Sequence, residues 1–77
     1  MITVKILINS VDKVKEFSSI ISKEGVECEL IEGVYIIDAK SIMGIFSMDL
    51  REPIQLNIHS DNNEILNKLK DFIVEEA

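Results

Sequence analysis

The chain has no tryptophan, one cysteine, one histidine and one proline, and only 5% of its residues are aromatic. A single cysteine excludes an internal disulfide and a cluster of thiolate metal ligands. Apolar side chains alternate around Cys28, so we expect its thiol to be buried in a strand. The chain also has no cluster of histidines, no glycine-rich phosphate loop and no pair of carboxylates beside a basic group. We therefore expect no metal or other cofactor, and no enzymatic activity.

Basic residues are scarce as well. The chain has 8 lysines and arginines against 14 aspartates and glutamates, which gives a formal net charge of −6. Affinity for nucleic acid depends on clustered lysine and arginine side chains, so this balance argues against a nucleic-acid partner. It suits docking on neutral or basic protein surfaces. We expect protein partners, and a chain that is itself a monomer or a weak homodimer.

Long apolar stretches are missing. Residues 1–8 are mostly apolar, but they are too few to span a membrane and are interrupted by Thr3 and Lys5. We therefore expect no signal peptide, no membrane insertion and a cytoplasmic location.

The periodicity of apolar residues divides the chain into seven elements. With 77 residues, of which 47% are apolar, the chain can build one small core, so we predict a single domain over residues 1–77. Strict alternation predicts strands, and spacing of three and four residues predicts helices. We expect strands over residues 2–8, 26–32, 34–38 and 54–59, and helices over residues 11–24, 42–48 and about 61–73.

Polar residues and glycine mark the predicted helix ends. Ser10 and Ser41 can each cap a helix that follows, and Gly25 can end the first helix in a left-handed conformation. Asp61 with Glu64 approximates a capping box. Each strand has one apolar face and each long helix one apolar stripe. This pattern favours an α+β fold of order βαββαβα, with a four-stranded antiparallel sheet and the helices on one of its faces.

The segment Lys40-Ser41-Ile42-Met43-Gly44 resembles the HPr phosphocarriers of the phosphoenolpyruvate-dependent sugar phosphotransferase system. The resemblance is strongest from Lys40 to Met48, and in the order of elements it covers nearly the whole chain. It implies the HPr-like open-faced β-sandwich. In that family a serine preceded by lysine begins the short helix, and Ser41 after Lys40 matches it. The resemblance therefore implies regulatory phosphorylation of Ser41, with phosphotransferase-system components or a serine kinase as partners.

The family carries its phosphate on a histidine at the start of the first helix, in a segment like Asn-Gly-Leu-His-x-Arg-Pro. The matching residues 9–16 contain no histidine. Matching Asn9 to the family's asparagine puts Asp12 in the histidine slot, whereas matching the later apolar pair Ile20-Ile21 puts Lys13 there. A lysine is protonated near neutral pH and is a poor phosphate acceptor. We therefore predict that no phosphate is carried on histidine.

An atypical phosphocarrier that uses Asp12 is the alternative, because an aspartate can form an acyl phosphate. A carboxylate just inside a helix start is, however, stabilised by the helix dipole without any further role. His59, the only histidine, is expected to be exposed at the end of the fourth strand. If the first and fourth strands are antiparallel neighbours, as in the family, His59 lies far from Asn9.

The short helix after Ser41 carries more apolar side chains than a core can bury. Ile45 and Met48 are three residues apart and can share a face that points to the core. Ile42 and Phe46 are four apart and share another face. The resemblance implies a docking patch for partner proteins here, although packing on the first helix and self-association remain alternatives. The predicted partner-binding residues are Lys40, Ile42, Met43 and Phe46.

Overall fold

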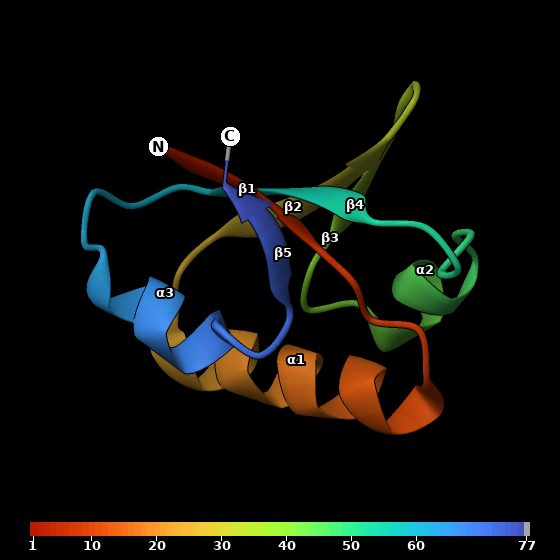
Figure 1. Cartoon of the computed structure of the whole chain (residues 1–77), viewed down its shortest axis with the longest axis horizontal. Helices are drawn as coiled ribbons and strands as arrows, with labels where there is room; N and C mark the ends of the chain where they lie inside the picture. The colour runs from red at the N-terminus through yellow and green to blue at the C-terminus, as the bar shows by residue number, and fades with distance from the viewer. Residues whose placement is uncertain (77) are drawn as a thin grey trace.

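A computed structural model describes residues 1–76, and the side chains of residues 1–75. These residues form an antiparallel sheet of five strands in the order β3-β2-β4-β1-β5, and three helices lie together on one face of it (Figure 1). The α+β architecture with helices on one face is as predicted. The elements are β1 (Ile2–Ile6), α1 (Val11–Glu24), β2 (Cys28–Glu32), β3 (Tyr35–Asp38), α2 (Ile42–Phe46), β4 (Ile54–Ile58), α3 (Glu64–Leu69) and β5 (Ile73–Glu76).

The sheet is built on β4, which pairs with β1 on one side and with β2 on the other. In the antiparallel ladder of β1 and β4, Ile2 lies opposite Ile58 and Ile6 lies opposite Ile54. Because side chains alternate between the faces of a strand, one face of β1, β2 and β4 directs buried apolar side chains toward the helices. The fully buried side chains that make up most of the core are Val4, Ile6, Ile8, Val14, Phe17, Ile21, Cys28, Leu30, Ala39, Ile45, Leu56, Ile58 and Leu69.

The ends of α1 and the first hairpin follow local rules. The Ser10 hydroxyl oxygen accepts a hydrogen bond from the Lys13 amide at 3.2 Å, and Gly25 ends the helix with a φ of 66°. Both features are as predicted. Gly33, with a φ of 59°, opens the two-residue turn between β2 and β3, which needs a left-handed first residue.

The prediction of one long C-terminal helix is wrong. Helix α3 ends at Leu69, and Ile73 begins a fifth strand that pairs antiparallel with β1. The sheet therefore has five strands instead of the predicted four. The free edge of β1 offers backbone hydrogen bonds, and the β-branched pair Ile73-Val74 fits a strand better than a helix. The apolar residues whose spacing predicted a longer helix lie partly in α3 and partly in the turn that follows it. In this turn the Phe72 amide donates a hydrogen bond to the Leu69 carbonyl.

The predicted capping box of Asp61 and Glu64 is also wrong. The Asp61 carboxylate instead accepts a hydrogen bond from the N-terminal ammonium of Met1 at 3.2 Å. The Glu64 amide donates to Asn62 Oδ1 at 3.0 Å, and α3 begins after Asn63. The N-cap position of α3 is taken by Asn63, so Asp61 lies two residues before the helix cap.

Candidate functional site

Helix α2 and the N-terminal part of α1 lie side by side at one end of the molecule (Figure 1). The loop before α2 is held by Asp38, whose carboxylate accepts the Lys40 amide at 2.9 Å. Ser41 then caps the helix, because its hydroxyl oxygen accepts the Gly44 amide at 3.2 Å. The helix is five residues long, shorter than the predicted 42–48, and the Met48 amide donates to the Ile45 carbonyl in a final turn.

Glycine at position 44 lets α2 lie directly on β3. A Cβ atom at this position would stand 2.8 Å from Ile37 Cγ2 and 3.0 Å from the hydroxyl oxygen of Ser41. Both distances are shorter than normal contacts, so a larger residue would push the helix away from the sheet. The close approach, together with the Ser41 cap, fixes the orientation of this short helix.

The fixed orientation divides the apolar side chains of α2 into two sets. Ile45 is fully buried and Met48 nearly so, which matches the face predicted for the core. Ile42, Met43 and Phe46 expose 39%, 85% and 42% of their surface. We call these three side chains the α2 patch. Helical spacing accounts for this division into a buried and an exposed set.

Val11 is a further exposed apolar side chain, which the sequence pattern did not single out. It is the first residue of α1, and more than half of its surface is exposed, next to the Ser10 cap. It lies at the end of α1 that is nearest to α2 (Figure 1). The sheet covers the apolar side of a helix only where the two overlap, and the first turn of a helix can extend past the edge of the sheet. Whether an apolar residue there is exposed depends on tertiary packing and cannot be read from the local sequence pattern.

The residues in the predicted histidine slot are exposed at the start of α1. Asp12 and Lys13 occupy the second and third positions of the helix. The Lys13 ammonium donates to Asn9 Oδ1 at 3.3 Å, and its backbone amide is held by Ser10. No imidazole lies at the start of α1. Asp12 and Lys13 are both candidates for the position of the family's histidine.

His59 lies at the opposite end of the sheet, as predicted. Residues that follow β1 come close to the start of β4, because Ile6 is paired with Ile54, whereas His59 follows the end of β4. Its Nε2 atom is 2.7 Å from Glu29 Oε1, and both side chains are partly exposed. His59 therefore cannot serve chemistry at the start of α1.

Lys40, the remaining predicted partner-binding residue, points its ammonium at Glu27, with Nζ 3.4 Å from Oε1. Exposed pairs of this kind contribute little to stability and exchange readily. Lys40 can therefore release Glu27 and meet a carboxylate on another molecule.

Cys28 is buried on the core face of β2, as predicted. Burial raises the pKa of the thiol to about 11, with smaller contributions from the carboxylates of Asp38 and Glu27, while Lys40 lowers it. The thiolate is the reactive form of cysteine, so this group is inert near neutral pH.

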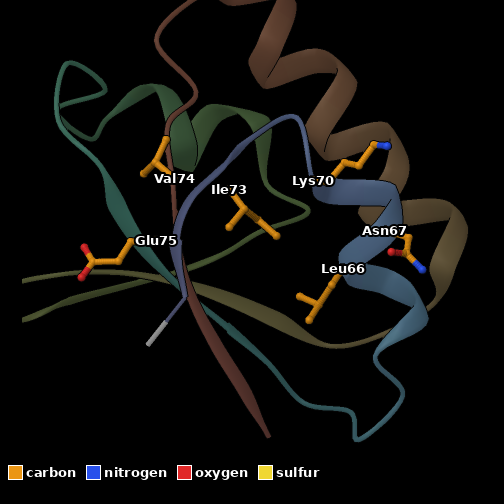
Figure 2. Close-up of a pocket in the computed structure, with 6 residues that line it drawn as sticks. All are labelled: Leu66, Asn67, Lys70, Ile73, Val74 and Glu75. Carbon is orange, nitrogen blue, oxygen red and sulfur yellow. The ribbon is translucent and has the colours of Figure 1, made fainter.

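An open hollow of about 310 Å³ lies between α3 and β5 (Figure 2). Leu66 and Ile73 face its interior, whereas Lys70 extends away from it. The rest of its lining is Asn67, Val74 and Glu75, and Glu75 is the only acidic side chain among the lining residues. Among the described residues, no group of three histidine, cysteine or acidic side chains could hold a metal ion. Residues 1–76 also contain no helix of the length and apolarity that crossing a membrane requires.

No family model matches the chain, and no curated protein matches it. Among solved structures it is similar to HPr-C-His from Thermoanaerobacter tengcongensis, with a TM-score of 0.75 and 25% sequence identity over 92% of this chain and 89% of that chain. The fold is HPr-like. This agrees with the architecture that the Lys40–Met48 segment and the order of elements implied. In this fold the Ser41 helix and the start of α1, the two segments that the family resemblance singled out, lie side by side (Figure 1).

Proposed function

We propose that this chain is an HPr-like docking module related to the sugar phosphotransferase system, and that it carries no phosphate on histidine. The observation behind the proposal is the α2 patch, three apolar side chains exposed on a helix whose other face is buried. A cytoplasmic location and the absence of enzymatic activity belong to the same proposal.

The patch has the physical properties of a docking site. Its helix is capped by Ser41 and approaches Ile37 closely at Gly44, and side chains on a helix that is already formed need less ordering on binding than those of a loop. Met43 is flexible and polarisable and can adapt to the shape of a partner. The net charge of −6 favours a partner with a neutral or basic surface. An acidic residue on such a partner could pair with Lys40.

The start of α1 supports the second half of the proposal. Imidazole accepts phosphate near neutral pH because its neutral ring nitrogen is available, and residues 9–16 contain none. The Lys13 ammonium donates a hydrogen bond to Asn9 and is a poor nucleophile in that state. Asp12 is exposed at the second position of α1, where its charge complements the helix dipole.

Binding to the general phosphotransferase of the system tests both halves. We expect the wild type to bind, and Met43→Asp to bind at least tenfold more weakly, because a carboxylate would be desolvated at the centre of the contact. Val34→Asp is the matched control, since Val34 is 92% exposed at the tip of the β2–β3 hairpin. With phosphoenolpyruvate present, we expect no phosphate on this chain by mass spectrometry.

Three results would contradict the proposal. Equal binding of Met43→Asp and the wild type would exclude the α2 patch as the contact. An acid-labile phosphate on the chain would restore a carrier role, and its loss in Asp12→Asn would assign it to Asp12. A wild type that fails to bind would remove the phosphotransferase system as the source of partners.

Regulatory phosphorylation of Ser41 is a second candidate, because this exposed hydroxyl lies at the start of α2, one residue from the α2 patch. A phosphate there would add about −1.5 to −2 charge at the edge of the patch, and the cost of desolvating this charge would weaken an apolar contact through the α2 patch. We expect a serine kinase of the system to modify the wild type and Ser47→Ala equally, and to leave Ser41→Ala unmodified by mass spectrometry. Modification of Ser41→Ala to the wild-type level would exclude this role.

A further inference from the structure

Strand β3 forms one edge of the sheet, on a hairpin that projects away from the helices (Figure 1). Three consecutive apolar residues are exposed there: Val34, Tyr35 and Ile36 expose 92%, 66% and 63% of their surface. They lie outside the α2 patch and are not used by the proposed function. Tyr35 and Ile36 point to opposite faces of the sheet, so apolar side chains are exposed on both faces of this edge strand, which makes the edge a candidate contact surface.

The two edges of the sheet differ in how they are protected against pairing with another strand. At the β5 edge, the ladder with β1 is irregular between Lys5 and Ile6, and bulges of this kind discourage further pairing. The β2–β3 ladder is regular over four residue pairs, from Glu29 opposite Asp38 to Glu32 opposite Tyr35. Strand β3 also contains no proline and no lysine, the residues that commonly block an edge.

We propose that β3 pairs antiparallel with β3 of a second copy of this chain, centred on Ile36. The two-residue turn makes Glu32 and Tyr35 a hydrogen-bonded pair, so Tyr35 and Ile37 direct their backbone groups toward β2. The amide and carbonyl of Ile36 then point away from the sheet. Two such strands related by a twofold axis can exchange both hydrogen bonds between their Ile36 residues, which is the self-complementary contact of a symmetric dimer.

On the outer face of the sheet, the pairing gathers apolar side chains that are exposed in the single chain. Ile31 lies opposite Ile36 and is half-buried. In the dimer the order across the two hairpins becomes Ile31, Ile36, the partner's Ile36 and the partner's Ile31. Formation of this continuous stripe buries apolar surface that the single chain exposes to water. On the same face, β1 and β4 carry the hydrogen-bonded polar residues Thr3 and Asn57.

On the helical face, the same register brings Tyr35 opposite the partner's Ile37. Beside Ile37, a hollow of about 300 Å³ separates β3 from the end of α2. The pairing therefore directs each Tyr35 ring toward the hollow of the other copy, where its hydroxyl can meet polar side chains. The hollow is lined by Glu32, Tyr35, Ile37, Ser47 and Met48.

The distribution of charge favours this register over one centred on Asp38. Asp38 falls opposite the partner's Val34, so the two Asp38 carboxylates are four residue steps apart, or about 13 Å. This exceeds the Debye length of about 8 Å at physiological ionic strength, so their repulsion is largely screened. A register centred on Asp38 would place the two carboxylates directly opposite each other. That register is also hindered because the Asp38 carbonyl already accepts the Ser41 amide.

Sedimentation equilibrium from about 10 µM to about 1 mM tests the dimer in a range that detects weak association. We expect the wild type to dimerise reversibly within this range. Ile36→Lys and Ile36→Glu should each weaken dimerisation at least tenfold, because position 36 meets itself and like charges would face each other. A mixture of the two variants should dimerise again. Val34→Lys should dimerise at least as well as the wild type, because its ammonium would face the partner's Asp38.

Several outcomes would overturn the proposal. These are a wild type that stays monomeric at about 1 mM, an Ile36→Lys variant that dimerises like the wild type, and a mixture of opposite charges that stays monomeric. Met43→Asp should dimerise like the wild type. If this variant stayed monomeric, self-association would be assigned to the α2 patch instead. Thermal unfolding followed by circular dichroism checks that the variants are folded, as expected for an exposed position. Because Met43 and Ile36 lie on different surfaces, this result is independent of the binding test above.

Discussion

Replacing Phe17 with alanine is expected to lower the free energy of unfolding by about 3–5 kcal/mol. Phe17 is fully buried in the middle of α1, and its ring meets the edge of Phe72 with centroids 6.0 Å apart and planes at 77°. The contact joins α1 to the turn between α3 and β5. Alanine would leave a cavity at this junction and remove the aromatic pair, which itself contributes about 0.5–1.5 kcal/mol.

A loss of this size is a large fraction of the total stability, which is roughly 4–12 kcal/mol for a domain of this length. Urea denaturation followed by circular dichroism measures the change. Val11→Ala is the control on the same helix, and we expect a change below about 0.5 kcal/mol because Val11 is largely exposed. Equal effects of the two variants would mean that α1 does not pack on the sheet through Phe17.

The second large effect is a loss of stability in alkaline solution that depends on Cys28. Burial raises the pKa of this thiol from 9.0 to about 11. Between pH 9 and 11, the Cys28 thiol is therefore protonated in the folded protein and ionised in the unfolded chain. The stabilisation is fully present below pH 9 and is lost as the pH rises through 11. At 1.36 kcal/mol for each pKa unit, the loss attributable to Cys28 is about 2–3 kcal/mol.

A comparison with Cys28→Ala isolates this contribution. The other ionisable side chains are the same in both proteins, so the difference between the two reports the contribution of position 28. We expect the stability difference between wild type and variant, measured by urea denaturation at pH 8 and at pH 11, to shrink or reverse at the higher pH. A difference that is the same at both pH values would show that the thiol ionises without cost and that position 28 is open to water.

Most of the elements could be predicted because their signals are local. Alternating residues in β1 and β4 can face one core only as strands. Ser10 caps α1 through its side chain, and Gly25 ends it in a left-handed conformation. The order of strands in the sheet was not predictable from periodicity, because every strand carries the same kind of apolar face. The C-terminus was mispredicted for a related reason. The residues around Ile73 fit a helical stripe, and only the free edge of β1 makes the strand the better solution.

The candidate sites likewise depend partly on local sequence patterns and partly on tertiary structure. Residues three and four apart on one helix determine by themselves that Ile45 and Met48 turn one way and the α2 patch the other. The absence of histidine from residues 9–16 is likewise a property of the sequence alone. Tertiary structure decided that Val11 is exposed beside α2, that Gly44 touches Ile37, and that β3 is an unprotected edge. Each of these depends on which elements become neighbours, and that is set by packing between residues far apart in the chain.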